Sequence, residues 1–402
     1  MAEASISPLF QDSLLANLAF WQARVEVPVS QFATLDSEAE NLAQAVRYGL
    51  ELPRAWEPAV QLALTLMEYV EGRGLWRGWL PLLERARGLI AASHPLWGRL
   101  TCRVGFLYRL DGQVPLALER HQEARAFAKA IGDEREAGLA ALGMADEYYL
   151  LHRYAEAEAA AQAGRETLLT HGETGPRRAA DNLLGMLAHA RGAYPEASRH
   201  YEAALAQWPP AQAPQKHAQT LTNYANTLRE LNRLAEAHAA LSQAVVLLEA
   251  CGSRLPLAFT QLALGTVFFS EGDYPAALAT FRAIDLVFLR RYGYLAPQAS
   301  VMNNLGHVHL ALKQYRAAEE YLSFAVEGWR TLEEPVNLAN TLGDLGEACF
   351  HQGLADQARL HWDEAHALLT RHLTHQPEDA WAQRLARGIT TRLAWIERPI
   401  GN

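Results

Sequence analysis

The chain has 402 residues, half of them hydrophobic, which is enough to bury a large core. There are 36 Lys and Arg residues against 45 Asp and Glu residues, and the net charge of −9 argues against binding to nucleic acids or anionic membranes. Its cysteines, Cys102, Cys251 and Cys349, lie far apart, which predicts free thiols in a reducing compartment rather than disulfides or a zinc site.

The N-terminal residues, MAEASISPLFQDS, lack the basic start and apolar run of a signal peptide. No apolar segment approaches the roughly 18 residues that a membrane helix needs. The sequence therefore predicts a soluble, cytoplasmic protein with no membrane partner.

Residues 1–54 are predicted to form an N-terminal helical cap. Within them, residues 35–51 are expected to be a helix that Asp36 or Ser37 can N-cap, with a buried stripe at Leu42, Val46 and Leu50. Residues 55–94 follow as a degenerate first repeat, because Gly78 stands 39 residues before the first of a regular series of alanines at Ala117.

Residues 95–376 contain seven repeats of about 40 residues, which we number one to seven. Each has a small anchor residue and, twelve residues later, an alanine. The anchors are Gly105, Ala145, Gly185, Ala225, Gly265, Gly306 and Gly346. The alanines are Ala117, Ala157, Ala197, Ala237, Ala277, Ala318 and Ala358.

Each repeat is predicted to be two amphipathic helices joined by a tight turn, such as EGDY at 271–274. Two helix axes approach to about 8–10 Å only where the contact residues are small, which explains the anchors and alanines. A left-handed glycine is expected to end the second helix of several repeats. These glycines are Gly132, Gly172, Gly252 and Gly293.

Residues 377–402 are predicted to be a C-terminal capping helix and tail, because a stack of repeats otherwise exposes its last hydrophobic face. An apolar stripe at helical spacing supports this interpretation. Its residues are Trp381, Leu385, Ile389, Leu393 and Ile396.

The spacing of small, aromatic and alanine residues resembles the tetratricopeptide repeat, over about 280 residues. The period is 40 rather than 34 residues, and this longer form is similar to the repeats of kinesin light chains and of maltose-activator-type bacterial regulators. The resemblance implies an all-α, right-handed superhelical solenoid of helix-turn-helix repeats.

A second resemblance lies upstream, where residues 35–46 are similar to the segment that opens the sensor repeats of bacterial STAND (NB-ARC-type) signalling ATPases. The matching residues are Leu35, Asp36, Glu38, Glu40, Asn41, Leu42, Ala45 and Val46. No G-x-x-x-x-G-K-[ST] sequence is present, so nucleotide hydrolysis is not carried over. The resemblance implies a sensor or scaffold without its ATPase.

In stacked helix pairs, the first helix of each repeat lines the concave surface, so residues three before, one after and four after each anchor are expected to face a groove. Asn side chains can pair with the backbone of an extended peptide, and the predicted ligand-binding residues are concentrated around them. These residues are Asn182, Asn226, Arg229, Asn303 and His307. The sequence thus predicts non-catalytic, regulatory binding of a peptide or protein segment.

The groove positions also favour some relatives over others. The carboxylate clamp that grips chaperone tails needs Lys and Arg, whereas this chain offers Asn303, His307 and Asp344 at the corresponding places. Peptide-pheromone receptors of the Rap type are similar in having about seven repeats after a helical N-terminal part. Residues 1–54, however, hold only about two helices and no helix-turn-helix.

Two alternatives stay open. The first is an assembly scaffold that acts through self-association or the convex face, so a homo-oligomer is possible. The second is a helical metal-dependent enzyme, but the pairs His307–His309 and His372–His375 do not make a chelating set at their spacing. No catalytic motif and no signature of a cofactor or metal is present.

Overall fold

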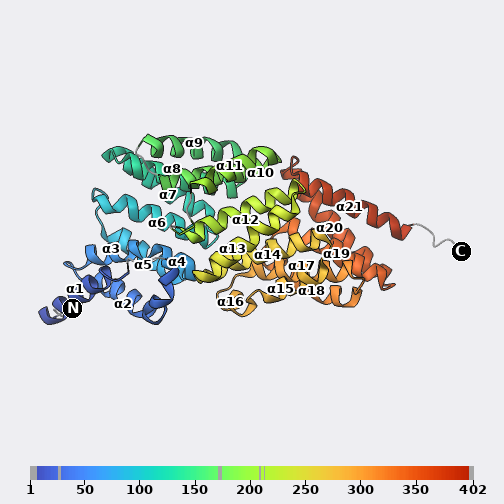
Figure 1. The fold of residues 1–402 in the computed structure, drawn as a ribbon, viewed down its shortest axis with the longest axis horizontal. Helices are drawn as coiled ribbons and strands as arrows, with labels where there is room; N and C mark the ends of the chain where they lie inside the picture. The colour runs from blue at the N-terminus through green and yellow to red at the C-terminus, as the bar shows by residue number, and fades with distance from the viewer. Residues whose placement is uncertain (1–6, 26–28, 171–173, 208–209, 212, 398–402) are drawn as a thin grey trace. The chain divides into compact units, whose positions relative to one another are not determined.

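The computed structural model describes residues 7–25, 29–170, 174–207, 210–211 and 213–397, and in these ranges all regular structure is helical. The chain divides into two compact units, residues 1–257 (unit 1) and 258–402 (unit 2), and the division falls within helix α14. The prediction of an all-α solenoid is confirmed, because each unit is built from consecutive helical hairpins (Figure 1).

Unit 1 starts with short helices and continues with four hairpins. The first part comprises α1 (Pro8–Gln22), a 3₁₀ helix (Val29–Glu38), α2 (Ala39–Gly49), α3 (Trp56–Thr65), α4 (Met67–Arg73) and α5 (Trp76–Leu89). The hairpins pair α6 (Pro95–Leu110) with α7 (Val114–Ile131), α8 (Glu134–Leu150) with α9 (Tyr154–Thr170), α10 (Thr174–Ala190) with α11 (Tyr194–Ala206), and α12 (Pro214–Glu230) with α13 (Leu234–Ala250).

Unit 2 holds three further hairpins and a last helix. Helix α14 (Arg254–Glu271) is followed by α15 (Tyr274–Ala283) and α16 (Leu286–Arg291). Helix α17 (Leu295–Ala311) pairs with α18 (Tyr315–Thr331), α19 (Pro335–His351) pairs with α20 (Ala355–His375), and α21 (Ala380–Glu397) comes last.

In the five repeats whose anchor is a glycine, the anchor lies under a larger side chain sixteen residues later, on the second helix. A Cβ atom added to Gly265 would lie 2.4 Å from the ring of Phe281, and one added to Gly306 would lie 2.5 Å from Leu322. The alanines twelve residues after the anchors are all 0 % exposed. The small residues therefore let the two helices of a hairpin approach closely, as their spacing predicts.

The turn inside each hairpin always contains one residue in the left-handed region, seven residues after the anchor. These residues are Gly112, His152, Gly192, Asn232, Gly272, Lys313 and Gly353, with φ between 57° and 82°. Such a residue ends a helix by satisfying its last carbonyl groups. Between hairpins, Gly132, Gly252 and Gly293 have positive φ as predicted, and Gly172 lies outside the described residues.

The second helix of the fifth repeat is broken, which the repeat pattern did not predict. It ends at Ala283, Ile284 adopts an extended conformation with ψ of 130°, and α16 begins two residues later. Ile284 occupies a position that holds Ala or Gly in the other repeats, where a larger side chain does not fit a close crossing. Asp285 then caps α16 by accepting the backbone N–H of Phe288 at 2.8 Å.

The predicted caps at the N-terminal end are wrong, although the buried stripe is right. Residues 29–38 form a 3₁₀ helix, so α2 starts later than expected, after Glu38. The carboxylate of Asp36 accepts hydrogen bonds from Arg73 Nε at 2.8 Å and from Tyr69 at 3.1 Å. It therefore connects to α4 instead of capping its own helix.

At the C-terminal end, the predicted stripe begins at the wrong residue. Trp381 is exposed, whereas Ala382 and Ile389 are buried in the core of unit 2. Trp395 also joins this core, with its ring centroid 5.8 Å from Phe350 and 5.9 Å from Trp362. The buried face of α21 is thus rotated slightly from the one that the sequence indicates.

One helix contradicts the statement that no segment is apolar enough for a membrane span. Residues 234–251, in α13, have the length and mean hydropathy of a possible span, and in the described part of the chain they alone do. Their apolar residues Leu241 and Leu248 are fully buried together with the alanines Ala237 and Ala244. These residues pack within unit 1, and 33% of the window is buried.

Candidate functional site

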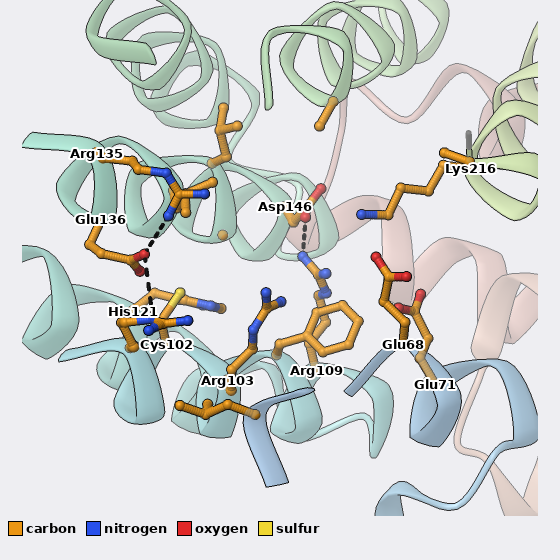
Figure 2. Close-up of a pocket in the computed structure, with 18 of the residues that line it drawn as sticks. Glu68, Glu71, Cys102, Arg103, Arg109, His121, Arg135, Glu136, Asp146 and Lys216 are labelled. Carbon is orange, nitrogen blue, oxygen red and sulfur yellow. Dashed lines mark hydrogen bonds and ion pairs between the residues drawn. The ribbon is translucent and has the colours of Figure 1, made fainter. Parts of the chain in front are cut away.

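A cavity of about 450 Å³ lies within unit 1, on the side formed by the first helices of successive hairpins. Helices α6 and α8 supply most of its wall, α10 and α12 contribute one or two residues each, and α4 closes it from the N-terminal side (Figure 2). A volume of this size is typical of sites for small molecules and peptide side chains.

The repeat register explains which residues of α6 and α8 reach the cavity. Cys102, Phe106 and Arg109 stand three before, one after and four after the anchor of the first repeat, and all three line the wall. Leu142 and Asp146 hold the first two of these positions in the second repeat and also line it. The predicted groove-facing offsets therefore match the cavity lining at all three positions of the first repeat and at two of three in the second, where Tyr149 is not part of the lining.

Two cations lie in the cavity without an ion pair. Arg103 on α6 and Lys216 on α12 are exposed, and among the described residues neither side chain has a carboxylate oxygen within 4 Å. In Figure 2, Arg103 lies near the centre, and Lys216 extends toward Glu68 and Glu71 of α4. Both cations are free to meet a negatively charged group of a ligand.

Arg109, by contrast, is held in place by its neighbours. It forms an ion pair with Asp146 and lies 3.6 Å from a carboxylate oxygen of Glu147. Its guanidinium also lies over the ring of Phe106, 4.9 Å from the centroid. These contacts make a preorganised wall in which an aromatic face and a charged group stand side by side.

Two carboxyl groups of the lining are shifted toward their neutral forms. Burial raises the pKa of Glu71, although Lys216, Arg109 and Arg103 act in the opposite direction. Burial also raises the pKa of Glu136, which is opposed by its ion partners Arg135 at 2.8 Å and Arg99 at 3.9 Å. Arg103 and Lys216 therefore remain the cations of the lining that an anionic group of a ligand can meet.

Beneath the cavity lies a buried ion pair that joins the first two repeats. The Nδ1 atom of His121 on α7 lies 2.9 Å from a carboxylate oxygen of Glu147 on α8, and the side chains are 2 % and 0 % exposed. Burial alone lowers the pKa of His121, but the charge and hydrogen bond of Cys102 and the carboxylate of Glu147 raise it to about 10. The imidazole is thus a cation at neutral pH.

Both members of this pair replace residue types that the other repeats keep apolar or small. The position of His121 holds Ala161, Tyr201, Leu241, Phe281, Leu322 and Trp362 in repeats two to seven. The position of Glu147 holds Leu107, Leu187, Thr227, Val267, Val308 and Ala348 in the others. These two substitutions compensate each other, because each charge would be costly to bury without the other.

The five residues predicted to bind a ligand do not line this cavity. In unit 1, Asn182 accepts a hydrogen bond from Asn223 at 3.3 Å, Asn226 is half-buried, and Arg229 pairs with Glu230 at 2.7 Å. The asparagine bond connects the first helices of the third and fourth repeats, so Asn182 has a structural partner.

The other two predicted residues belong to unit 2. Asn303 accepts a hydrogen bond from Thr341 at 2.8 Å, which connects α17 to α19. His307 is exposed, and its ring lies 4.7 Å from that of Phe269. Its charge also lowers the pKa of the buried Asp344, although burial is the larger effect and the net shift is upward.

Sequence reasoning missed the cavity because one wall comes from α4, outside the regular repeats. It also missed His121 and Glu147, for which a signal was available. When equivalent positions of the seven repeats are compared, a charged residue among buried apolar ones indicates a site where packing does not decide the residue type. Comparison of the positions sixteen residues after each anchor identifies His121 in this way. Among the described residues, no cluster of ligating side chains could hold a metal ion.

The tetratricopeptide-repeat family matches residues 177–250 and 297–384. No curated protein is similar to this chain in sequence. Among solved structures, a Rap protein complexed with Competence and Sporulation Factor matches 91% of this chain and 99% of its own, with 14% identity and a TM-score of 0.60.

Two further structures share the fold. The apo form of the quorum sensor NprR from B. thuringiensis covers 90% of this chain and 99% of its own, at 13% identity and a TM-score of 0.56. A STAND protein with a tetratricopeptide repeat sensor from Pyrococcus horikoshii covers 87% of this chain, at 13% identity and a TM-score of 0.57. This chain spans only 55% of that STAND protein. At these identities the likeness concerns the fold.

The matched family, the 40-residue register and the stacked hairpins agree with one another. Repeats of this kind form extended concave surfaces that serve as scaffolds for binding proteins or peptides. Over residues 177–250 and 297–384 the chain is thus similar to the tetratricopeptide-repeat family, and its helical hairpins have the fold of such repeats.

Proposed function

We propose that this protein is a non-catalytic, regulatory binding module that holds a peptide or a protein segment in the cavity of unit 1. The observation that carries the proposal is the cavity itself, in which Phe106, Leu139 and Leu142 form an apolar part beside the unpaired cations Arg103 and Lys216. An apolar surface beside charged groups that no protein partner engages can hold a ligand and fix its orientation.

The cavity lies where the regular repeats meet the segment that precedes them, so the proposed function includes the boundaries of the repeats. We assign residues 95–376 to seven repeats, with residues 1–54 as an N-terminal cap and residues 55–94 as a degenerate repeat that contains α4. The position of α4 supports this assignment, because Glu68 and Glu71 contribute to the same wall as the true repeats. Residues 377–402 are assigned to a C-terminal capping helix and its tail.

The fold is compatible with this role. The Rap protein that matches along nearly its whole length was solved with Competence and Sporulation Factor bound, so a solenoid of this size can hold a ligand. The low identity means that no residue role transfers to this chain. The proposed ligand class therefore rests on the cavity of this protein alone.

A selection from a random peptide library displayed on phage tests the proposal. The full-length protein is the bait, and the enriched peptides are then challenged with the Phe106→Ala variant. We expect enrichment of peptides that combine an acidic residue with an apolar one, and their loss from Phe106→Ala. Equal retention by the variant, or no enrichment on the wild type, would contradict the proposal.

A second candidate function is assembly through the second helices. Phe324 on α18 is 71% exposed and Leu360 on α20 is 67% exposed, which is unusual for large apolar side chains. Sedimentation velocity of the full chain and of the Phe324→Ser/Leu360→Ser variant distinguishes this candidate. An oligomer of the wild type that dissociates in the double variant would support assembly through these helices. Monomers of both proteins would exclude it.

A further inference from the structure

Cys102 differs from the other cysteines of the chain in its surroundings. It is half-buried and lines the cavity of unit 1, whereas Cys251 and Cys349 are buried elsewhere in the fold. Its sulfur lies beside the imidazole of His121, as Figure 2 shows. Cys102 is therefore the one cysteine that a molecule in the cavity can reach.

The neighbours of Cys102 form a relay of three groups. The thiol interacts with the imidazole of His121, and the Nδ1 atom of that imidazole lies 2.9 Å from a carboxylate oxygen of Glu147. The ring lies between two glycines, since a Cβ added to Gly105 or Gly143 would meet it at 3.0 Å or 2.5 Å. The close walls fix the orientation of the imidazole toward the sulfur.

The charged groups around the relay are of both signs, and most of them are paired with one another. Helix α6 presents Arg99, Arg103 and Arg109, and α8 presents Arg135 together with Glu136, Asp146 and Glu147. Of these, Glu147 is engaged by His121, Asp146 by Arg109, and Glu136 by Arg135 and Arg99. Arg103, one residue from Cys102, is left for an incoming anion.

The thiolate is the nucleophilic form of cysteine, and a positive charge fixed beside the sulfur stabilises the negative charge that the sulfur carries when it reacts. A buried cation kept in place by a buried carboxylate cannot swing away from the sulfur, in contrast to a histidine on the surface. Packing alone does not require a histidine at this position, because five of the other six repeats fill it with a large apolar or aromatic side chain.

We propose that Cys102 is a nucleophilic thiol that forms mixed disulfides with anionic disulfide compounds entering the cavity. This inference goes beyond the proposed binding of a peptide and does not depend on it. His121 and Glu147 act as positioning residues, and Arg103 selects for negative charge. The ligand class is a small disulfide or a disulfide-bearing peptide with a carboxylate near its sulfur atoms.

The reaction is a balanced thiol–disulfide exchange. The thiolate of Cys102 attacks one sulfur of the disulfide, and a new S–S bond forms to Cys102 while the original S–S bond breaks. The second half of the compound leaves as a thiolate with the bonding electron pair. Cys102 is oxidised, the leaving half is reduced, and the proton that the thiol loses on forming the thiolate passes to solvent.

The test uses two disulfide probes on the full-length protein at pH 7. One is the anionic 5,5′-dithiobis(2-nitrobenzoate), and the other is the neutral 4,4′-dithiodipyridine; release of the coloured thiol gives the rate. We expect one fast thiol equivalent per chain, assigned to Cys102 because Cys102→Ser removes it. The remaining cysteines should react only when the protein is unfolded.

Two variants test the roles of the neighbours. His121→Leu installs the residue that Leu241 and Leu322 supply in other repeats. We expect it to slow both probes roughly tenfold or more, because it removes the positive charge beside the sulfur. Arg103→Gln should slow the anionic probe while leaving the neutral probe nearly unchanged. The ratio of the two rates therefore reports the charge selection.

Three outcomes would contradict the proposal or part of it. If Cys102 reacts no faster than a cysteine of the unfolded chain, or if His121→Leu reacts as fast as the wild type, the proposal is wrong. An unchanged ratio of the two probes in Arg103→Gln would overturn the charge selection. If His121→Leu fails to fold, the variant Glu147→Gln decides, because it keeps the imidazole and removes the group that holds it charged.

Discussion

The indole of Trp362 covers Gly346 so closely that a Cβ atom on residue 346 would lie 2.4 Å from Nε1. The same Nε1 donates a hydrogen bond of 2.9 Å to the carbonyl oxygen of Gly343. The glycine anchor and the large residue sixteen positions later are thus one structural device, in which the second helix places a flat side chain on bare backbone of the first.

This relationship predicts the effect of Gly346→Ala. The added methyl group must displace an indole that is fully buried and hydrogen-bonded, so we expect a loss of about 1–3 kcal/mol in the free energy of unfolding. Gly388→Ala is the matched control, because nothing lies within 4 Å of its Cβ position in α21. There, alanine should stabilise by about 0.5–1 kcal/mol. Urea titrations of both variants measure the difference, and equal effects would contradict the packing.

The left-handed residues in the hairpin turns lead to a second prediction. Lys313 has φ of 59°, which costs an L-residue roughly 1–2 kcal/mol, so Lys313→Gly should stabilise the protein by up to about 1 kcal/mol. Asn232→Gly should gain less, because asparagine tolerates this region better. Thermal melts followed by circular dichroism compare the two variants. A destabilised Lys313→Gly would show that the lysine side chain, and not the turn, matters.

The ion pair of His121 predicts how stability depends on pH. The pKa of this residue is about 10 in the folded protein, against about 6.5 for an unperturbed histidine, so between these values the folded chain holds a proton that the unfolded chain has lost. Its contribution is fully present below pH 6.5 and is lost as the pH rises toward 10. The wild type should therefore lose its advantage over His121→Leu across this window, in urea titrations at pH 6, 8 and 10. A constant difference would contradict the assignment.

Asn182 and Asn226, both predicted to bind a ligand, should respond differently to substitution by alanine, because Asn182 is hydrogen-bonded to Asn223. Asn182→Ala removes the acceptor of Asn223, so it should lower the melting temperature. If a bound peptide extends along α12, Asn226→Ala should weaken its binding several-fold, by about 0.5–1.5 kcal/mol, while the melting temperature stays nearly unchanged. Binding and melting curves of both variants check this. Asn226→Ala with full affinity would confine the ligand to the cavity.

The sequence predicted the parts of this structure that depend on periodic packing. Gly185 must be small because Tyr201 lies on it, and such a requirement recurs every 40 residues, where it can be read from one chain. The extended backbone at Ile284 and the contact of Asp36 with Arg73 each occur once in the chain. The first depends on one side chain and the second on one partner distant in sequence. Periodicity carries no information about them.

Some features of the candidate site could likewise be predicted from the repeat spacing, and others could not. The repeat offsets placed Cys102 and Phe106 on the concave side correctly, since the helical period alone decides which face they occupy. The offsets could not show where the concave side is closed, because Glu71 reaches the cavity from α4, a short helix outside the regular register. The asparagines of the later repeats are visible in the sequence as hydrogen-bonding groups, whereas the closure of the cavity beside the first two repeats is not.

The affinity of a selected peptide for charge-reversal variants tests the central claim most directly. Lys216→Glu changes an exposed lysine in the cavity, and Lys129→Glu changes an exposed lysine on the second helix α7, outside it. Calorimetric titration of the full-length proteins should show binding weakened roughly tenfold or more in Lys216→Glu and unchanged in Lys129→Glu. Equal affinities in all three proteins, or a loss only in Lys129→Glu, would contradict a binding site in this cavity.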